Sequence, residues 1–505
     1  MMVRLLFPDV DVSLAPTVAP ELVHLVEADL GLDIVYDAMA DGDGFLRDTC
    51  RRVLLHSLSD PDQIAYRQHA LADCIAAEPT VRELYQLAVD AGQVQRSLFL
   101  GGLLGRDPSS ILHRAVQLLG LLTEKLAALR DFGTEHAGQF HSAAFTGFWA
   151  TIADQLDDVY LSAVRAELAE LSLPRGAQLS LGLGPGNTGI DHRLHRTARH
   201  NWWARFTGGE HTGLAFTVDD RDEAGSDALT EIAGRAVNSV ANTATQAADH
   251  IQGFFGRLRF ELGFYLGCVN LHRRLGCLGV GTGMPIAAPA TPRRLHARDL
   301  RDIALCLSKP GRVVGNDLAA DGAVLVVVTG ANEGGKSTFL RSLGSAQLMM
   351  QAGMFVTAES LTASVCTGVY THFKREEDAT MARGKLDEEL ARMSAIADSV
   401  TPGALLLCNE SFASTTEREG SQIARGVIQA LTSAGITVVF VTHMFDLADS
   451  LYRRGDEHHL FLRAQRRSDT SRTFHVVEAA PKATSHGLDS FARVFGEPAR
   501  LPASG

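Results

Sequence analysis

A glycine-rich segment, VVVTGANEGGKSTFLRS at residues 326–342, has the residue types and spacing that bind a phosphate. Gly330, Gly335, Lys336 and Ser337 satisfy the pattern G-x-x-x-x-G-K-[ST], between a β-branched run and a helical pattern. In such a loop the backbone N–H groups surround a phosphate, the lysine reaches the terminal phosphates and the serine hydroxyl binds Mg²⁺. The segment predicts a site for ATP and Mg²⁺; a chance glycine-rich turn before a helix is the alternative.

Two further apolar runs end in residues that suit the same chemistry. ALLLCNE, residues 404–410, places Glu410 where a general base polarises the attacking water, but Asn409 where an Asp usually holds the water shell of the metal. Asn keeps an oxygen and lacks the negative charge, so we expect weaker Mg²⁺ binding or slower hydrolysis. ITVVFVTH, residues 436–443, ends in His443, which can hydrogen-bond a γ-phosphate. A histidine without a role is the alternative.

The elements that must position these residues follow a strand–loop–helix pattern after a turn-rich joint at 279–294, as in an α/β nucleotide-binding domain. The charged run at 374–390 is expected to be a solvated helix face with i,i+4 pairs. The expected strands are 323–329, 355–358, 365–371, 404–408, 436–442 and 459–463.

The preceding residues are mainly helical in pattern. Residues 12–170 have helical periodicity, clearest at 62–75 and 111–130. Glycine and proline then punctuate short alternating segments at 178–183 and 213–218, which predicts a hairpin or small sheet. Helical periodicity resumes from about 228 to 278. We therefore expect a multidomain fold, in which an α-helical domain with a small β insert precedes an α/β P-loop NTPase domain. The expected boundaries are 1–173, 174–227, 228–285 and 286–505.

The bulk composition excludes several classes of protein. At 505 residues with 46% hydrophobic and 21% charged residues, the chain is typical of several globular domains. Seven cysteines without a C-x-x-C pair argue against a zinc ribbon or disulfide framework and for buried free thiols. The net charge of −12 argues against a dedicated nucleic-acid coat. With no spanning helix or secretory signal apparent, we expect a cytoplasmic location and no membrane contact.

Residues 310–498 resemble the ATPase domain of the MutS DNA mismatch-repair proteins, a branch of the ABC-type ATPases. Residues 54–75, LLHSLSDPDQIAYRQHALADCI, resemble the start of the helical lever domain of that family. In the ATPase part the resemblance is carried by NDL (316–318), TGANEGGKSTFLR (329–341), GMFVTAES (353–360), NESFASTTEREG (409–420), VTHMFDL (441–447) and SHGLDSFARVFGEP (485–498).

The resemblance implies roles for individual residues. Glu410 would activate water, His443 would sense the γ-phosphate, and Lys336 would stabilise phosphate charge. Ser337 would bind Mg²⁺ directly, and Asn409 would lie in its second shell. The residues expected to bind the nucleotide are Asn316, Gly330, Asn332, Gly334, Gly335, Lys336, Ser337 and Thr338.

The resemblance also implies a homodimer with its two nucleotides near the subunit interface. RGKLDEEL, residues 383–390, stands where the family presents a Ser-bearing motif to the partner's nucleotide, so activation across a dimer would use different atoms. We find no F-x-E segment of the kind that full mismatch sensors insert into the minor groove, and no C-terminal Smr nuclease. We therefore expect a short, stand-alone MutS relative without the mismatch-recognition domain.

The segment DHRLHRTARHNWWARF, residues 191–206, is the best candidate for DNA contact, because basic residues interleaved with aromatics suit phosphate contact and base stacking. Its place between two helical runs resembles that of the family's clamp domain. The alternative is a hairpin whose arginines are solvated or paired with the acidic residues at 219–223. The candidate residues are Arg193, Arg196, Arg199, Trp202, Trp203 and Arg205.

Together these observations predict a slow P-loop ATPase of the MutS type that acts as a nucleotide-switched dimer on structured or damaged DNA. The alternative is a nucleotide-gated scaffold whose partner is a protein, with very slow hydrolysis and no specific DNA binding. Asn409 and the net charge are consistent with that alternative.

Overall fold

The computed structural model divides the chain into two compact units. Unit 1 comprises Met1–Val3, Pro79–His141 and Phe145–Leu262, and unit 2 comprises Arg4–Glu78, Ser142–Ala144 and Gly263–Gly505. The residues that the structure describes are 2–8, 14–99, 108–173, 178–187, 189–195, 222–309, 311, 313–330, 334–375, 384–466 and 472–482.

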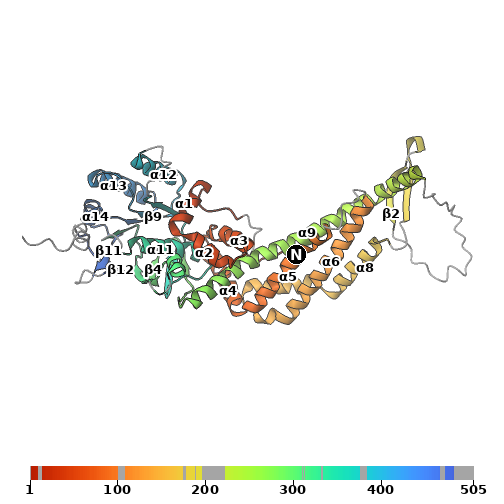
Figure 1. Cartoon of the computed structure of the whole chain (residues 1–505), viewed down its shortest axis with the longest axis horizontal. Helices are drawn as coiled ribbons and strands as arrows, with labels where there is room; N and C mark the ends of the chain where they lie inside the picture. Colours follow the sequence, from red (N-terminus) through yellow and green to blue (C-terminus); the bar gives the residue numbers. More distant parts are fainter. Residues whose placement is uncertain are drawn as a thin grey trace, which may run out of the picture. The chain divides into compact units, whose positions relative to one another are not determined.

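Unit 1 is built from long helices that lie side by side (Figure 1). Apolar residues of α6 and α9, among them Leu112, Leu122 and Val237, form its core, and Leu168 of α8 packs against them. The helices are α5 (Glu78–Phe99), α6 (Pro108–His136), α7 (Ala143–Gln155), α8 (Asp158–Leu171) and the long α9 (Glu223–Cys277), which continues into unit 2. The expected helical periodicity at 111–130 and at 228–278 is confirmed.

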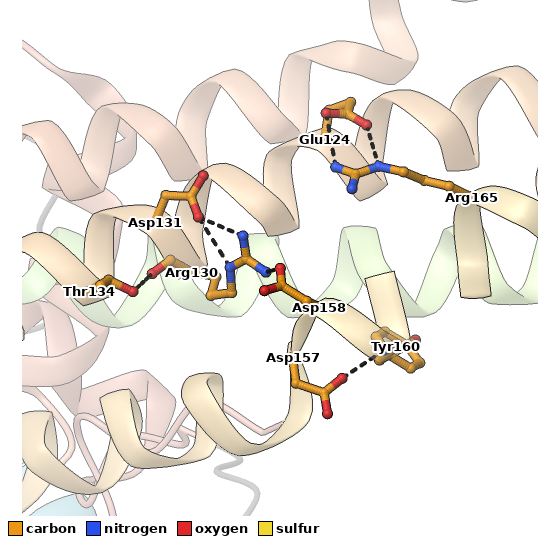
Figure 2. Close-up of polar contacts among 8 residues, drawn as sticks. All are labelled: Glu124, Arg130, Asp131, Thr134, Asp157, Asp158, Tyr160 and Arg165. Atoms are coloured by element: carbon orange, nitrogen blue, oxygen red, sulfur yellow. Dashed lines mark hydrogen bonds and ion pairs between the residues drawn. The ribbon is translucent and has the colours of Figure 1, made fainter. Parts of the chain in front are cut away.

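Ion pairs connect α6 to α8 on the outside of this core (Figure 2). Arg130 Nη1 lies 2.5 Å from Asp158 Oδ1, and Arg165 Nε lies 3.1 Å from Glu124 Oε1. Asp157 caps α8 by accepting a hydrogen bond from the Tyr160 backbone N–H. Because these carboxylates are well exposed, each pair contributes little stability, and the apolar core holds the helices together.

A β-hairpin follows α8, as the alternating pattern predicts. Strands β1 (Gln178–Leu183) and β2 (Gly189–His195) pair antiparallel, with Leu179 opposite Leu194 and an irregularity between Ser180 and Gly182. Leu194 packs against the core of unit 1. The second expected segment, 213–218, lies outside the described residues.

Unit 2 contains a six-stranded sheet in the order β12-β11-β6-β10-β9-β8. Its strands pair parallel, except that β12 is antiparallel to β11. The parallel strands are nearly continuous runs of buried Val, Leu and Phe, as both faces are covered. The strands are β6 (Leu325–Thr329), β8 (Val369–Phe373), β9 (Leu405–Asn409), β10 (Thr437–Val441), β11 (His459–Arg466) and β12 (Arg472–Glu478).

Helices cover both faces of this sheet (Figure 1). One apolar cluster joins alternate strand residues such as Leu325, Val327 and Leu406 to α1, α12, α13 and α14. The other face contacts α11, which is buried along nearly its whole length. The bounds are α1 (Pro20–Leu30), α11 (Lys336–Gln351), α12 (Lys385–Ser399), α13 (Glu417–Ser433) and α14 (Phe445–Tyr452).

A second, four-stranded sheet in the order β3-β7-β4-β5 also contacts α11, so that helix packs against both sheets. Its strands are β3 (Ile286–Ala288), β4 (Leu295–Leu300), β5 (Asn316–Ala319) and β7 (Ser360–Ser364). The remaining helices of unit 2 are α2 (Leu32–Ala40), α3 (Gly44–Leu54), α4 (Pro61–Ala76) and α10 (Ile303–Ser308).

The strand predictions differ from the structure in three respects. The expected strand at 355–358 is wrong, because only Val356 forms an isolated bridge, with Gly283. The strand expected at 365–371 begins later, at Val369. Four strands of the second sheet and β12 were not expected, since β4 and β5 carry charged residues and are short. The other four expected strands are confirmed within three residues at each end.

The compact units group residues differently from the segments expected at 1–173, 174–227, 228–285 and 286–505. Residues Arg4–Glu78 belong with the α/β part. Val18 and Leu22 lie in the apolar cluster of the six-stranded sheet, and the Arg67 guanidinium donates to the Ala352 carbonyl at the end of α11. Helical periodicity alone does not reveal which partner a helix packs against.

Six of the seven cysteines are buried free thiols, as expected, and Cys277 is exposed. No helix within the described ranges has the length and apolar character needed to cross a membrane.

Packing around Trp149 generates a stability prediction. A Cβ at Gly133 of α6 would lie 2.7 Å from Trp149 Cε3, and the ring is 5% exposed and surrounded by Phe132, Phe140 and Phe148. We expect Gly133→Ala to destabilise the protein by about 1–3 kcal/mol, because the ring must shift within a packed core. Thermal unfolding followed by circular dichroism measures the effect.

The matched control is Gly120→Ala in the same helix, where a Cβ meets no atom within 4 Å. Alanine should there stabilise the helix by about 0.5–1 kcal/mol, because glycine loses more backbone entropy on folding. Equal unfolding midpoints for the two variants would show that the contact with Trp149 imposes no constraint.

Candidate functional site

The glycine-rich loop connects β6 to α11 as its sequence predicts. Gly335 caps the helix with φ 92°, a left-handed conformation that favours glycine, and Lys336 is the first helical residue. Lys336 is 3% exposed, and its Nζ donates to the Gly330 carbonyl at 2.7 Å. Burial lowers the pKa of Lys336, and the Glu410 carboxylate opposes that shift. Asn332 lies outside the described residues.

Asn409 and Ser337 are brought into contact. Asn409 ends β9, and the hydroxyl of Ser337, the second residue of α11, donates to Asn409 Oδ1 at 3.0 Å. The two side chains thus offer a hydroxyl and an amide carbonyl, which are oxygen ligands of the kind that suits Mg²⁺ with several retained waters. The residues present therefore fit a magnesium ion, although they carry no charge. Within the described part, no group of three or more His, Cys, Asp or Glu could hold a metal.

Glu410 and His443 approach each other from neighbouring strands. Glu410 has φ 54°, and its backbone N–H donates to the Val441 carbonyl at 2.8 Å. Its Oε2 lies 3.8 Å from Nδ1 of His443. The imidazole, together with the Lys336 ammonium, holds the pKa of Glu410 below its usual value despite burial. Glu410 is therefore an ionised carboxylate at neutral pH, as a base that orients water must be.

Lys336, Ser337 and Glu410 line a cleft of about 280 Å³ in unit 2. Asn409 and His443 are not in its wall, but Asn409 contacts Ser337 and His443 lies near Glu410. Thr338 also lies in its wall. The Asn316 amide is engaged with β12, since Oδ1 accepts from the Val476 N–H at 2.7 Å and Nδ2 donates to the Phe474 carbonyl at 3.4 Å. The lining residues are Leu305, Val314, Asn316, Gly334, Gly335, Lys336, Ser337, Thr338, Glu410 and Phe474.

Sequence reasoning missed Phe474 of β12. It lies in the cleft wall beside Gly335, is 44% exposed and has φ 60°. An exposed aromatic ring beside a phosphate loop can stack on a planar base. The signal in the sequence was weak, because β12 is a short edge strand with polar residues.

Sequence reasoning also missed a buried carboxylate beneath the site. Glu389 was expected within a solvated helix face at 374–390, and that expectation is wrong for this residue, which is 1% exposed. Glu389 Oε2 accepts from the Phe412 N–H at 2.7 Å, and Oε1 accepts from the Ser414 hydroxyl at 2.6 Å. The carboxylate thus anchors the loop that begins at Glu410.

His372 of β8 supports the same loop. Its pKa is lowered to about 4, mainly by burial, so the ring is neutral at pH 7. Nε2 lies 3.0 Å from the Glu389 carbonyl, which only an N–H can satisfy, and Nδ1 lies 2.6 Å from the Ser411 hydroxyl. We therefore assign the proton to Nε2. The single hydroxyl proton of Ser411 then faces two acceptors, Nδ1 and the His372 backbone carbonyl, which lies 2.8 Å from the hydroxyl oxygen.

The loop that carries His443 is anchored as well. Glu417, in the first turn of α13, accepts a hydrogen bond from the Phe445 N–H at 2.8 Å. The Met444 N–H donates to the Thr442 hydroxyl at 3.0 Å. Glu410 and His443 are thus each held by a loop that is hydrogen-bonded to a neighbouring element.

The candidate DNA-binding residues are only partly described. Arg193 lies on β2 and is exposed, and near it the Ser180 hydroxyl is 2.6 Å from Nε2 of His195. The residues Arg196, Arg199, Trp202, Trp203 and Arg205 lie outside the described residues.

Two protein families match the chain. The MutS2 N-terminal domain matches residues 59–278, and MutS domain V matches residues 326–503. The second match contains the phosphate loop, Asn409, Glu410 and His443.

Individual relatives match part of the chain. DNA mismatch repair protein MutS 2 of Halobacterium salinarum is 30% identical over 205 residues, which are 40% of this chain and 24% of that protein. DNA mismatch repair protein MutS of Thermus aquaticus is 31% identical over 166 residues, 33% of this chain and 20% of that protein. The matched part of this chain therefore spans about a quarter or less of the curated relatives.

The buried carboxylate generates a prediction. Glu389→Gln leaves one acceptor oxygen for two donors, the Phe412 N–H and the Ser414 hydroxyl. We expect a loss of stability of about 1–3 kcal/mol, because a buried donor is left without a partner. Denaturant unfolding measures the change.

Asp398→Asn is the matched control on the same helix, because Asp398 is exposed. That change should stay within about 0.5 kcal/mol. If both variants lost the same stability, the contacts of Glu389 would not anchor the loop.

Proposed function

Because this chain belongs to the MutS family, we propose that it binds ATP and Mg²⁺ at the phosphate loop and hydrolyses the ATP slowly. In members of this family, domain V is the ATPase domain. The observation that carries the proposal is the convergence of Lys336, Ser337 and Glu410 on one cleft at the ends of parallel strands, with Asn409 hydrogen-bonded to Ser337.

Each residue has a distinct task in this proposal. The Lys336 ammonium exchanges its bond with the Gly330 carbonyl for the terminal phosphates of ATP. Mg²⁺, when bound, neutralises charge on the phosphates. Ser337 and Asn409 hold that ion or its waters through their oxygens.

Glu410 orients a water molecule and accepts its proton as the oxygen attacks the γ-phosphorus. His443 lies 3.8 Å from the Glu410 carboxylate, so it fixes that side chain and can donate a hydrogen bond to a phosphate oxygen. Phe474 stacks on the base of the nucleotide. The anchored loops keep both groups in place before the nucleotide binds.

We further propose that nucleotide binding switches a homodimer whose partner is DNA of unusual structure, without direct reading of mismatches. The relatives are named as DNA mismatch repair proteins. The exposed Arg193 on the β1–β2 hairpin offers a phosphate contact. The helix α9 runs from unit 1 into unit 2, so a nucleotide-dependent change in one unit would reach the other in part through this helix.

A second candidate function is a nucleotide-gated scaffold that binds a protein instead of DNA. The net charge of −12 favours it, because a net negative protein repels a phosphate backbone. Both candidates share the ATP site and differ only in the partner.

The uncharged metal ligand generates a prediction. Asn409→Asp adds a charge while keeping the oxygen that accepts from Ser337. We expect the Mg²⁺ concentration for half-maximal ATP turnover to fall about tenfold, which corresponds to about 1.4 kcal/mol of binding energy. Steady-state phosphate release, titrated with Mg²⁺, measures it.

Asn409→Ala should shift the same titration in the opposite direction, and Lys336→Ala should abolish ATP binding in calorimetry. If Asn409→Asp left the titration unchanged, the missing charge would not limit metal binding. If ATP with Mg²⁺ gave no binding signal to the unchanged protein, the proposed ATPase would be excluded.

The two candidate functions differ in their response to salt. If Arg193 contacts a phosphate, the affinity of Arg193→Ala for branched DNA should depend less steeply on salt. The magnitude of the slope of log affinity against log salt concentration should fall by about one. Arg165→Ala is the control, because Arg165 already pairs with Glu124. Fluorescence anisotropy between low and physiological salt measures both. An affinity that does not depend on salt, or no binding at all, would favour the scaffold.

A further inference from the structure

A second cavity in unit 2, of about 310 Å³, lies at the opposite ends of the strands from the phosphate loop. Its wall includes Leu405 and Thr437, which are the first residues of β9 and β10. Asn409 ends β9 four residues after Leu405, which places the two sites about 13 Å apart along the strand. The cavity therefore does not belong to the nucleotide site.

The wall of this cavity is apolar on one side and cationic on the other. Leu343 of α11 and Leu405 are almost fully buried and supply apolar surface. Arg293 and Arg294 also line it, whereas none of the described lining residues is acidic. A ligand with an apolar body and an anionic end matches this distribution.

The two arginines differ in what already balances their charge. Arg294 Nη1 lies 3.1 Å from Asp321 Oδ2, so its charge is paired. Arg293 Nη2 donates to the Gly435 carbonyl at 2.9 Å, and no carboxylate in the described part of the chain lies within ion-pair distance of it. A guanidinium has five N–H donors and binds carboxylates in a bidentate manner, so Arg293 retains the capacity to bind one.

We propose that this cavity binds a small amphipathic carboxylic acid, with its carboxylate on Arg293 and its apolar chain against Leu343 and Leu405. A cavity of about 150 Å³ holds benzene, so this one has room for an acid of about ten non-hydrogen atoms. The site is independent of the proposed ATPase, because it shares no lining residue with the nucleotide cleft.

Isothermal titration of the full-length protein without nucleotide, with octanoate as the probe, tests the proposal. For a ligand of this size we expect a Kd on the order of 0.1–1 mM. Octan-1-ol has the chain without the charge, and inorganic phosphate has charge without the chain. Both should bind at least about tenfold more weakly, since the carboxylate contributes charged hydrogen bonds.

Arg293→Gln should weaken octanoate binding by about tenfold or more, for the same reason. Arg298→Gln is the matched control on β4, because Arg298 lies near Glu359 and does not line the cavity. Ala323→Leu fills the cavity without changing its charge, and it should also abolish binding. This variant keeps the test valid if Arg293→Gln fails to fold.

Three results would overturn the proposal. Octan-1-ol that binds as tightly as octanoate would exclude a carboxylate site. Phosphate that competes fully with octanoate would indicate a simple surface anion site. Binding that survives both Arg293→Gln and Ala323→Leu would place octanoate elsewhere on the protein.

Discussion

The parallel register of β6, β10 and β9 is the constraint on which the candidate site depends. Val441 pairs with Val328 on one side and with Asn409 on the other, so the three strands end in one row. The chain then leaves the sheet, which brings the phosphate loop, Glu410 and His443 to the same edge. A slip of one residue would turn Asn409 toward the opposite face and separate it from Ser337.

The strands alone do not fix the catalytic groups, because Glu410 and Phe412 both have a positive φ that costs about 1 kcal/mol or more for residues other than glycine. The hydrogen bonds of the buried Glu389 and of His372 offset that cost. A neutral His372 suits this role, since a second charge in the same buried region would need its own partner. Buried polar contacts between strands β8 and β9 and helix α12 thus hold the loop that carries Glu410 in its conformation.

The sequence predicts the parts of this arrangement that depend on local pattern. The phosphate loop, the apolar strands that lead to Asn409 and His443, and the first strand of the hairpin are local, and the structure has them. The anchoring role of Glu389 and the place of Phe474 depend on contacts between residues far apart in the chain. A charged helix face looks the same in sequence whether one of its carboxylates is buried or all are solvated. The sequence did not predict that residues 4–78 belong to the α/β unit for the same reason. The amphipathic pattern of a helix does not indicate which element that helix packs against.

The pairing of a neutral Asn409 with an ionised Glu410 bears on whether a nucleotide is held or consumed. With a second carboxylate at position 409, the Glu410 pKa would rise through like-charge repulsion, which would make it a stronger base. Here His443 and Lys336 instead hold the Glu410 pKa below its usual value, far from the neutral pH at which a general base is most effective. In the proposed ATPase, weaker metal binding and a weaker base would both slow hydrolysis. Such a site would favour the long-lived nucleotide complex that the proposed switch requires.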